Sequence, residues 1–165
     1  MRSALINNIR PSKSPYASPF FFIKKRDGKL RPIQDYRRLN SYTIKNQYPL
    51  PLIADLTNSF ARVHIFTKLD IRWGYNNIRI KEGDEYKAAF KKKYGLWEPT
   101  VMFFGLCNSP STFQAMMDWI FRPVIDKWEP LGTKVGKYMD DVAVATCTNL
   151  DDHIACVTEI LELAM

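Results

Sequence analysis

Asp140 and Asp141 are adjacent carboxylates, with Val135 and Tyr138 before them and the run Val142-Ala143-Val144-Ala145 after them. Apolar and β-branched residues on both sides of a polar pair predict two strands joined by a turn. Asp is common in tight turns because its side chain hydrogen-bonds locally. Taken alone, the pair therefore predicts a β-hairpin and no particular chemistry.

A third carboxylate, Asp70, also ends an apolar run, Ile65-Phe66-Thr67-Lys68-Leu69. An aspartate at the end of such a strand needs a partner from elsewhere in the fold. Three carboxylates from two strands form a site for hard divalent cations, which take oxygen ligands. Two such ions clamp a transferring phosphoryl group. Asp70, Asp140 and Asp141 are therefore predicted to form a two-metal site for phosphoryl transfer.

A basic hairpin is predicted near the N-terminus. Two strand-like runs, 20–26 and 29–33, flank Asp27-Gly28, and this arrangement is a strong β-hairpin signal. Pro32 would then lie on an edge strand. The hairpin carries five basic side chains, Lys24, Lys25, Arg26, Lys29 and Arg31. Lys supplies a point charge and Arg a bidentate fork, so this hairpin is suited to bind phosphates.

Charge is distributed unevenly along the 165 residues, whose formal net charge is +7. Residues 1–50 contain eleven Lys and Arg against two acids, whereas residues 51–165 contain thirteen against fifteen. This asymmetry predicts polyanion capture in the N-terminal third and metal chemistry in the remainder.

Other bulk features narrow the class of protein. The length and the 46% hydrophobic content predict one domain, or a substantial piece of one, with a buried core. Three scattered cysteines without CxxC spacing favour a reducing, intracellular setting and argue against disulfides and zinc. No apolar run approaches the ~20 residues of a membrane span.

The order of strands and helices predicts an α+β fold, with helices on one face of an antiparallel sheet. Apolar spacing predicts helices over 51–61, from Ser109 onward, and from Asn149 onward. The expected buried faces are Phe113, Met117, Ile120 and Val124 in the second helix, and Ile154, Val157, Leu161 and Ala164 in the third.

The remaining expectations concern strands and loops. Residues 78–80 are expected to pair with a strand near Ala88–Phe90, and 97–104 to form a further strand. Prolines predict a loop over 1–19, and Lys91–Lys93 is expected to be a solvated loop. Tyr36, Leu39 and Tyr42 are expected to be buried anchors.

In their order and spacing, these motifs resemble the fingers and palm of a reverse transcriptase, that of Gypsy-class long-terminal-repeat retrotransposons. The resemblance runs from about Ile9 to the end of the chain. The runs that carry it are 9–12, 18–28, 31–40, 48–53, 69–75, 104–114 and Tyr138-Met139-Asp140-Asp141.

The resemblance implies a polymerase right-hand fold and individual roles. Asp70, Asp140 and Asp141 would be the catalytic carboxylates that hold two Mg²⁺ ions, or Mn²⁺ as a substitute, with Ile71 as a further metal contact. Lys25, or its neighbour Lys24, would grip the triphosphate together with Arg31. Tyr75 would exclude a 2′-hydroxyl. The implied nucleotide-binding set is Lys25, Arg31, Ile71, Arg72, Tyr75, Phe104, Gly105 and Met139.

The resemblance also implies partners and a domain plan. The partners would be an RNA or DNA template with primer, deoxynucleoside triphosphates, and the rest of a Pol polyprotein with RNase H and integrase. The location would be intracellular, in a cytoplasmic particle or the nucleus, with no membrane contact. Residues 1–61 and 76–104 would be fingers-like, and 62–75 and 105–165 palm-like. This single-domain fragment would lack the thumb, connection and RNase H.

Three positions depart from the family pattern: Trp73 replaces a small residue, Asn76-Asn77 replaces His-Gln, and Lys137 replaces an apolar residue. Two functions stay open. The chain is either an RNA-directed DNA polymerase fragment, or an inactive or domesticated retroelement relic that acts as a basic nucleic-acid-binding module. The three intact carboxylates favour the enzyme, and the missing thumb favours the relic. A nucleotide-cyclase-like palm would not explain the basic hairpin.

Overall fold

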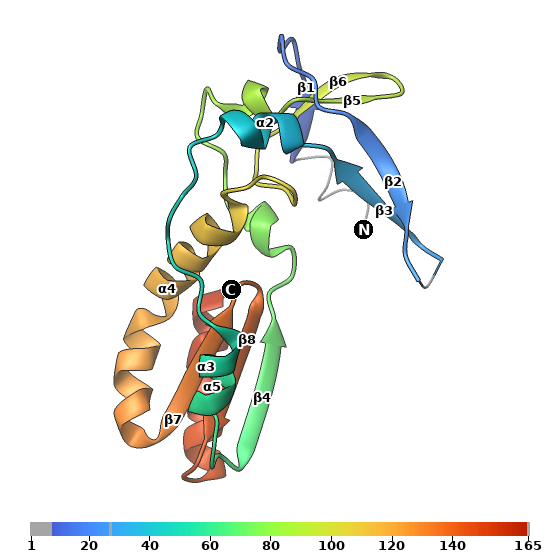
Figure 1. Cartoon of the computed structure of the whole chain (residues 1–165). Coiled ribbons are helices and arrows are strands. Elements are labelled where there is room, and N and C mark those ends of the chain that lie inside the picture. The colour runs from blue at the N-terminus through green and yellow to red at the C-terminus, as the bar shows by residue number, and fades with distance from the viewer. Residues whose placement is uncertain (1–7, 27, 165) are drawn as a thin grey trace. The chain divides into compact units, whose positions relative to one another are not determined.

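The computed structural model describes residues 8–26 and 28–164 (Figure 1). By its internal contacts the chain divides into two compact units. The first unit contains Met1–Asn46 and Tyr75–Ser109, and the second contains Gln47–Gly74 and Pro110–Met165. The sequence of the first unit holds seventeen Lys and Arg against six Asp and Glu, a net charge of +11. That of the second holds seven against eleven, a net charge of −4.

An antiparallel sheet of order β4-β8-β7 forms the centre of the second unit (Figure 1). Its strands are β4 (Ile65–Asp70), β7 (Thr133–Tyr138) and β8 (Asp141–Thr146). The helical elements are α3 (Ile53–Ser59), α4 (Ser109–Trp128), η3 (Glu129–Leu131) and α5 (Leu150–Ala164). The hairpin around the adjacent aspartates and the strand that ends in Asp70 are thereby confirmed, as is an antiparallel sheet combined with helices.

Helix α4 buries the face that its apolar spacing predicts. Phe113, Met117 and Val124 are each at most 1% exposed, and Ile120 is half-buried. These side chains recur at intervals of three and four residues, which places them on one side of a helix. The predicted core of this helix is confirmed.

Helix α5 packs on the β4-β8-β7 sheet, but the buried face predicted for it was wrong. Its N-terminus is capped by Asn149, whose Oδ1 accepts the Asp152 N–H at 2.8 Å. Ile154, Leu161 and Ala164 are nevertheless exposed and Val157 is only half-buried. The buried side chains are His153, Cys156 and Ile160.

His153 explains the shifted face. Its ring nitrogens lie 2.7 Å from the Thr67 hydroxyl of β4 and 2.9 Å from the Thr146 hydroxyl of β8. A buried imidazole with two partners is satisfied, and burial lowers its pKa. Apolar spacing alone does not mark a histidine as a core position.

The first unit combines two small antiparallel sheets with short helical turns (Figure 1). One sheet has the order β1-β6-β5, and the other is the two-stranded hairpin β2-β3. The elements are β1 (Ile9–Pro11), β2 (Phe20–Lys24), β3 (Leu30–Gln34), α2 (Arg37–Tyr42), η1 (Gly74–Asn77), η2 (Glu85–Ala88), β5 (Phe90–Lys92) and β6 (Gly95–Pro99). The hairpin confirms its sequence signal, although Asp27 lies outside the described residues. Pro32 stands opposite Phe22, in a sheet whose two strands are both edges.

Strand pairing in the first unit differs from the expectation at two places. Residues 9–11, expected to be loop, form β1 and pair with β6. Residues 78–80 make only one bridge, Arg79 with Val101, while β5 pairs with β6. The β1–β6 pairing joins segments far apart in the sequence, which local propensity does not specify, whereas β5 and β6 are joined by a two-residue loop.

Two burial expectations in the first unit also fail. Tyr36 is 1% exposed and donates its hydroxyl to the Ala88 carbonyl at 2.9 Å, as an anchor should, but Tyr42 is 81% exposed. Lys91 and Lys92 belong to β5 rather than to a solvated loop. The Lys92 ammonium lies 5.3–5.7 Å from three aromatic ring centres, and burial lowers its pKa. Within the described residues, no helix is both long and apolar enough to cross a bilayer.

Candidate metal and nucleotide site

The turn between β7 and β8 is a two-residue loop, because Tyr138 pairs with Asp141 and only Met139 and Asp140 lie between them. Met139 has a φ of 54°. Two-residue hairpins use turns with positive φ, since these match the twist of the strands. Such a backbone is unfavourable for a residue with a side chain. The surroundings must therefore hold this turn in place.

Asp70 stands directly opposite Asp141 in the β4–β8 register, and the Ile71 N–H donates to the Asp140 carbonyl at 2.8 Å. Residues opposite each other in an antiparallel pair have Cα atoms about 4.5–5.5 Å apart, with side chains on one face. The backbone therefore gathers all three aspartates at one end of this sheet.

A lysine shares the face of the sheet with these carboxylates. Lys68 Nζ lies 3.0 Å from Asp141 Oδ1, and the side chains are 69% and 47% exposed. The hydrogen bond to Asp141, with smaller contributions from the charges of Asp70 and Asp140, raises the pKa of Lys68. Lys68 was not singled out from the sequence, although its position two residues before Asp70 places it on the same face of β4.

Asp70, Asp140 and Asp141, with the neighbouring backbone, offer the chemistry of a magnesium site, because Mg²⁺ takes carboxylate and backbone oxygens as ligands. Among the described residues, however, no three His, Cys, Asp or Glu side chains converge closely enough to hold an ion. The register brings the three backbone positions together, and the Asp141 carboxylate forms an ion pair with Lys68. Metal binding by Asp70, Asp140 and Asp141 stays a prediction.

The same geometry predicts that Lys68→Met strengthens cation binding. A cation that uses the Asp141 oxygen must displace the Lys68 ammonium from its exposed ion pair. Because exposed ion pairs are weak, removing the lysine should tighten Mn²⁺ binding by about fivefold or less, as measured by electron paramagnetic resonance on the 165-residue chain. The control is Lys127→Met, which removes the exposed pair with Glu159 and should change nothing. Equal or weaker Mn²⁺ binding in Lys68→Met would count against a cation at Asp141.

A polar network on α4 holds the Met139 turn, and no local sequence pattern predicts it. Gln114, 1% exposed, accepts the Met139 N–H at 3.1 Å and donates to Asp118 at 3.0 Å. Asp118 also accepts from the Tyr48 hydroxyl at 2.5 Å and pairs with Lys137 at 2.7 Å. Burial raises the pKa of Asp118, but its bonds to Lys137 and Tyr48 outweigh burial and lower it. Lys137, which departs from the family pattern, thus forms an ion pair with Asp118 of helix α4.

The segment after Asp70 makes a close approach to the turn. A Cβ at Gly74 would lie 2.9 Å from the Phe113 ring and 3.3 Å from the Asp140 Cβ, so glycine permits this packing. The preceding residue, Trp73, has a φ of 62° and is 43% exposed. A bulky residue in this left-handed conformation is strained. The departure at Trp73 therefore has a backbone cost, and the residue stays partly exposed.

The other predicted nucleotide contacts fall into the two units. Ile71, Arg72 and Met139 lie in the second unit with the aspartates, whereas Lys25, Arg31, Tyr75, Phe104 and Gly105 lie in the first. Arg31 stands opposite Ile23 on the hairpin, and the Lys25 N–H donates to the Lys29 carbonyl at 2.7 Å. The side chains of Lys25 and Arg31 are exposed.

Tyr75, Phe104 and Gly105 lie together within the first unit. The Tyr75 ring is 9% exposed and packs edge-on against Phe104, with ring centres 4.8 Å apart. Gly105 has a φ of 98°, and a Cβ there would lie 3.3 Å from the Gln34 carbonyl. A small recess of about 340 Å³ opens beside Gly105. This glycine therefore permits close backbone packing.

Three comparisons with known proteins agree on the family to which this chain is similar. Residues 23–164 match the family model "Reverse transcriptase (RNA-dependent DNA polymerase)". The Tf2-3 transposon polyprotein of Schizosaccharomyces pombe is 37% identical over 154 residues, which cover 93% of this chain and 11% of that polyprotein. The Tf2-7 polyprotein of the same yeast is 36% identical over the same length. The chain thus spans about a tenth of these relatives.

Solved structures show the same fold. A foamy viral protease–reverse transcriptase in complex with double-stranded DNA aligns with a TM-score of 0.85 at 18% identity, over 96% of this chain and 26% of that one. The complex of a foamy viral protease–reverse transcriptase with an RNA/DNA hybrid aligns with a TM-score of 0.83 at 17% identity, over 94% and 20%. Since the family model covers most of the sequence, the chain belongs to the reverse transcriptase family.

Proposed function

We propose that this chain is the fingers and palm region of an RNA-directed DNA polymerase encoded in a Gypsy-class long-terminal-repeat retrotransposon polyprotein. The single observation that carries the proposal is the placement of Asp70 opposite Asp141 beside the Asp140 turn. The relatedness to Tf2 polyproteins supports the retrotransposon origin.

The opposite net charges of the two units support different roles for them. The second unit, with a net charge of −4, would be palm-like and hold the metal, and the first unit, with a net charge of +11, would be fingers-like and bind polyanions. Residues 47–61 group with the second unit, so the palm-like region would begin before residue 62. A primer–template and deoxynucleoside triphosphates are the proposed ligands, consistent with the nucleic-acid complexes of the similar foamy viral enzymes.

Asp70, Asp140 and Asp141 would hold two Mg²⁺ ions, with the Ile71 backbone as a further contact. When bound, the ions would lower the pKa of the primer 3′-hydroxyl and neutralise the triphosphate and leaving pyrophosphate. Phosphoryl transfer depends mainly on positioning, and Gln114 contributes by fixing the Met139 backbone. Lys25 and Arg31 would hold the triphosphate, with Arg72 beside it. Phe104 and Gly105 would line the nucleotide and template side, and Met139 the primer terminus.

The proposal predicts that Arg31→Ala raises the KM for deoxynucleotides about tenfold or more, since a charge-assisted phosphate contact contributes about 1.5–3 kcal/mol. The assay is primer extension on an RNA template by a chimera in which this chain replaces the matching 154 residues of the Tf2-3 polyprotein. Lys91→Ala removes an exposed lysine of β5 and serves as the control. Comparing Lys24→Ala with Lys25→Ala identifies the lysine contact.

Two outcomes would contradict the proposal. A chimera that binds primer–template but never extends it, although the same preparation of the yeast protein does, would indicate a binding module. An unchanged KM in Arg31→Ala would remove Arg31 from the proposed nucleotide site.

A further inference from the structure

The Met139 turn is held by a side-chain amide that could point either way. Met139 has a φ of 54°, and its N–H donates to the Gln114 Oε1 at 3.1 Å. A glutamine amide carries an acceptor oxygen on one side and a donor NH₂ group on the other. If the amide were reversed, two donors would face each other and this hydrogen bond would be lost. The strained turn therefore depends on the orientation of the Gln114 amide.

Asp118 sets this orientation. It follows Gln114 by four residues on α4, so the two side chains lie on one face of the helix. The Asp118 Oδ1 accepts from the Gln114 Nε2 at 3.0 Å. An ionised carboxylate accepts hydrogen bonds and donates none, so the amide NH₂ faces Asp118 and the amide oxygen faces the Met139 N–H. Gln114 is only 1% exposed, and bulk water therefore does not compete for either end of the amide.

Two further donors hold the Asp118 carboxylate. The Lys137 Nζ lies 2.7 Å from its Oδ1, and the Tyr48 hydroxyl donates to its Oδ2 at 2.5 Å. Burial raises the pKa of Asp118, but these two hydrogen bonds outweigh burial and lower it, so the group is ionised at neutral pH. The side chains of Lys137 and Asp118 are 14% and 29% exposed, which limits screening by salt. Lys137 also lies on β7, two residues before Met139, so the carboxylate is connected to the turn by two routes.

From these contacts we propose that Asp118 is a positioning residue for the turn that carries Asp140. Its role is to orient the Gln114 amide, and contact with the metal or the substrate is no part of that role. The effect on catalysis rests on the proposed function, in which Asp140 holds metal and Met139 lines the primer terminus. The effect on the turn can be measured without either ligand. If Asp118 merely fastened α4 to β7, its removal would loosen the helix and the turn together.

Hydrogen exchange distinguishes these two roles. The chain contains six methionines, so ¹⁵N-methionine labelling gives a simple NMR spectrum. Met139 reports on the turn, and Met117, which is 1% exposed, reports on the core of α4. On the 165-residue chain in EDTA, Asp118→Asn should accelerate exchange of the Met139 amide about three- to tenfold and leave that of Met117 unchanged. Asparagine offers both an oxygen and an NH₂ group, so it no longer fixes the Gln114 amide.

Glu159→Gln is the matched control. Glu159 likewise accepts from a lysine, Lys127, at 2.7 Å and from an aromatic side chain, the Trp128 Nε1, at 2.8 Å. It lies on α5 in the same unit as the turn. Its replacement should leave the exchange of both methionine amides unchanged.

Exchanging the two polar groups tests the orientation directly. In the double variant Gln114→Glu/Asp118→Asn, the carboxylate lies beside Met139 and the amide lies beside Lys137 and Tyr48. An acceptor again faces the Met139 N–H, and the amide can donate to it. Because the two positions are coupled, the double variant should return the Met139 exchange rate to within about twofold of that of the unmodified chain.

Primer extension gives the functional readout. In the Tf2-3 chimera, Asp118→Asn should lower kcat about tenfold, and the double variant should recover most of it. The KM for deoxynucleotides should stay unchanged, because Lys25 and Arg31, proposed to hold the triphosphate, lie in the other unit. An unchanged kcat in an active chimera would overturn the role in catalysis. An inactive chimera would count against the proposed function alone, because exchange is measured without metal, primer or nucleotide.

Three exchange results would overturn the inference. They are no acceleration at Met139, equal acceleration at Met139 and Met117, and a double variant whose Met139 exchanges as fast as in Asp118→Asn. Thermal melting verifies that each variant is folded. If Asp118→Asn is unfolded, the double variant decides, and loss of folding in both variants would assign Asp118 a purely structural role.

Discussion

Asp140→Asn is expected to reduce primer extension about a thousandfold or more while leaving the fold unchanged. The substitution removes a charge without removing volume, and the Asp140 carbonyl still accepts the Ile71 N–H. Loss of a group that stabilises transition-state charge commonly costs about 10²–10³ in rate, and loss of a metal ligand adds weaker ion binding. The assay is single-turnover extension by the Tf2-3 chimera, with Mn²⁺ binding and thermal melting measured on the 165-residue chain.

The second Asp-Asp pair of the chain offers a matched control. Asp151 is exposed in the first turn of α5, where an acid interacts favourably with the helix dipole by about 0.3–1 kcal/mol. Asp151→Asn should therefore keep full extension and Mn²⁺ binding, with only a small loss of stability. Extension by Asp140→Asn within tenfold of the unmodified chimera would refute the catalytic assignment. Equal loss in both variants would point to a general effect of removing acids.

The structural features that were predicted correctly depend on residues close to one another in the sequence. The Asp-Gly hairpin, the hairpin around Met139-Asp140 and the α4 core each depend on turn chemistry or periodicity within a short window. Such local agreement is typical of natural sequences. The three aspartates were grouped because each lies at the end of an apolar run, and the register of β4 with β8 places their backbones together.

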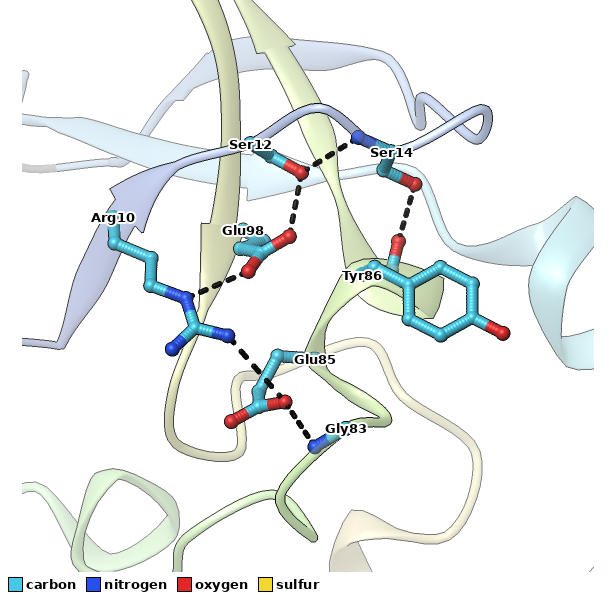
Figure 2. Close-up of polar contacts among 7 residues, drawn as sticks. All are labelled: Arg10, Ser12, Ser14, Gly83, Glu85, Tyr86 and Glu98. Atoms are coloured by element: carbon cyan, nitrogen blue, oxygen red, sulfur yellow. Dashed lines mark hydrogen bonds and ion pairs between the residues drawn. The ribbon is translucent and has the colours of Figure 1, made fainter.

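What the sequence did not predict depends on residues far apart in the chain. Strand β1 pairs with β6, where Arg10 stands opposite Glu98 (Figure 2), and no local pattern encodes a contact between residues so far apart. The α5 face is set by two threonine hydroxyls on other elements. Lys137 was noted only as an unusual residue, since Asp118 lies nineteen positions earlier on another element. In each case a polar partner, rather than an apolar side chain, determines the packing, and a hydrophobic pattern does not show it.

Tyr75→Val should raise ribonucleotide incorporation relative to deoxyribonucleotide incorporation by about tenfold or more. The Tyr75 ring is held edge-on by Phe104 at 4.8 Å and is only 9% exposed, so it cannot swing freely away from a larger sugar. A rigid ring discriminates by steric exclusion, and valine leaves space for a 2′-hydroxyl. Pocket contacts that differ by one or two atoms typically alter selectivity about 10- to 200-fold.

Two measurements, the melting temperature and the sugar selectivity, distinguish a steric gate at Tyr75 from simple core packing. Removing a largely buried ring costs about 3 kcal/mol or more in a well-packed core, so Tyr75→Val should also lower the melting temperature of the chain. If Tyr75 only packs against Phe104, stability falls while the ratio of the two kcat/KM values stays unchanged. Tyr94→Val, at an 83% exposed tyrosine of the same unit, should alter neither quantity. Parallel kinetics on matched ribo- and deoxyribonucleotides by the chimera decide the matter, because a steric gate changes the ratio even where total activity declines.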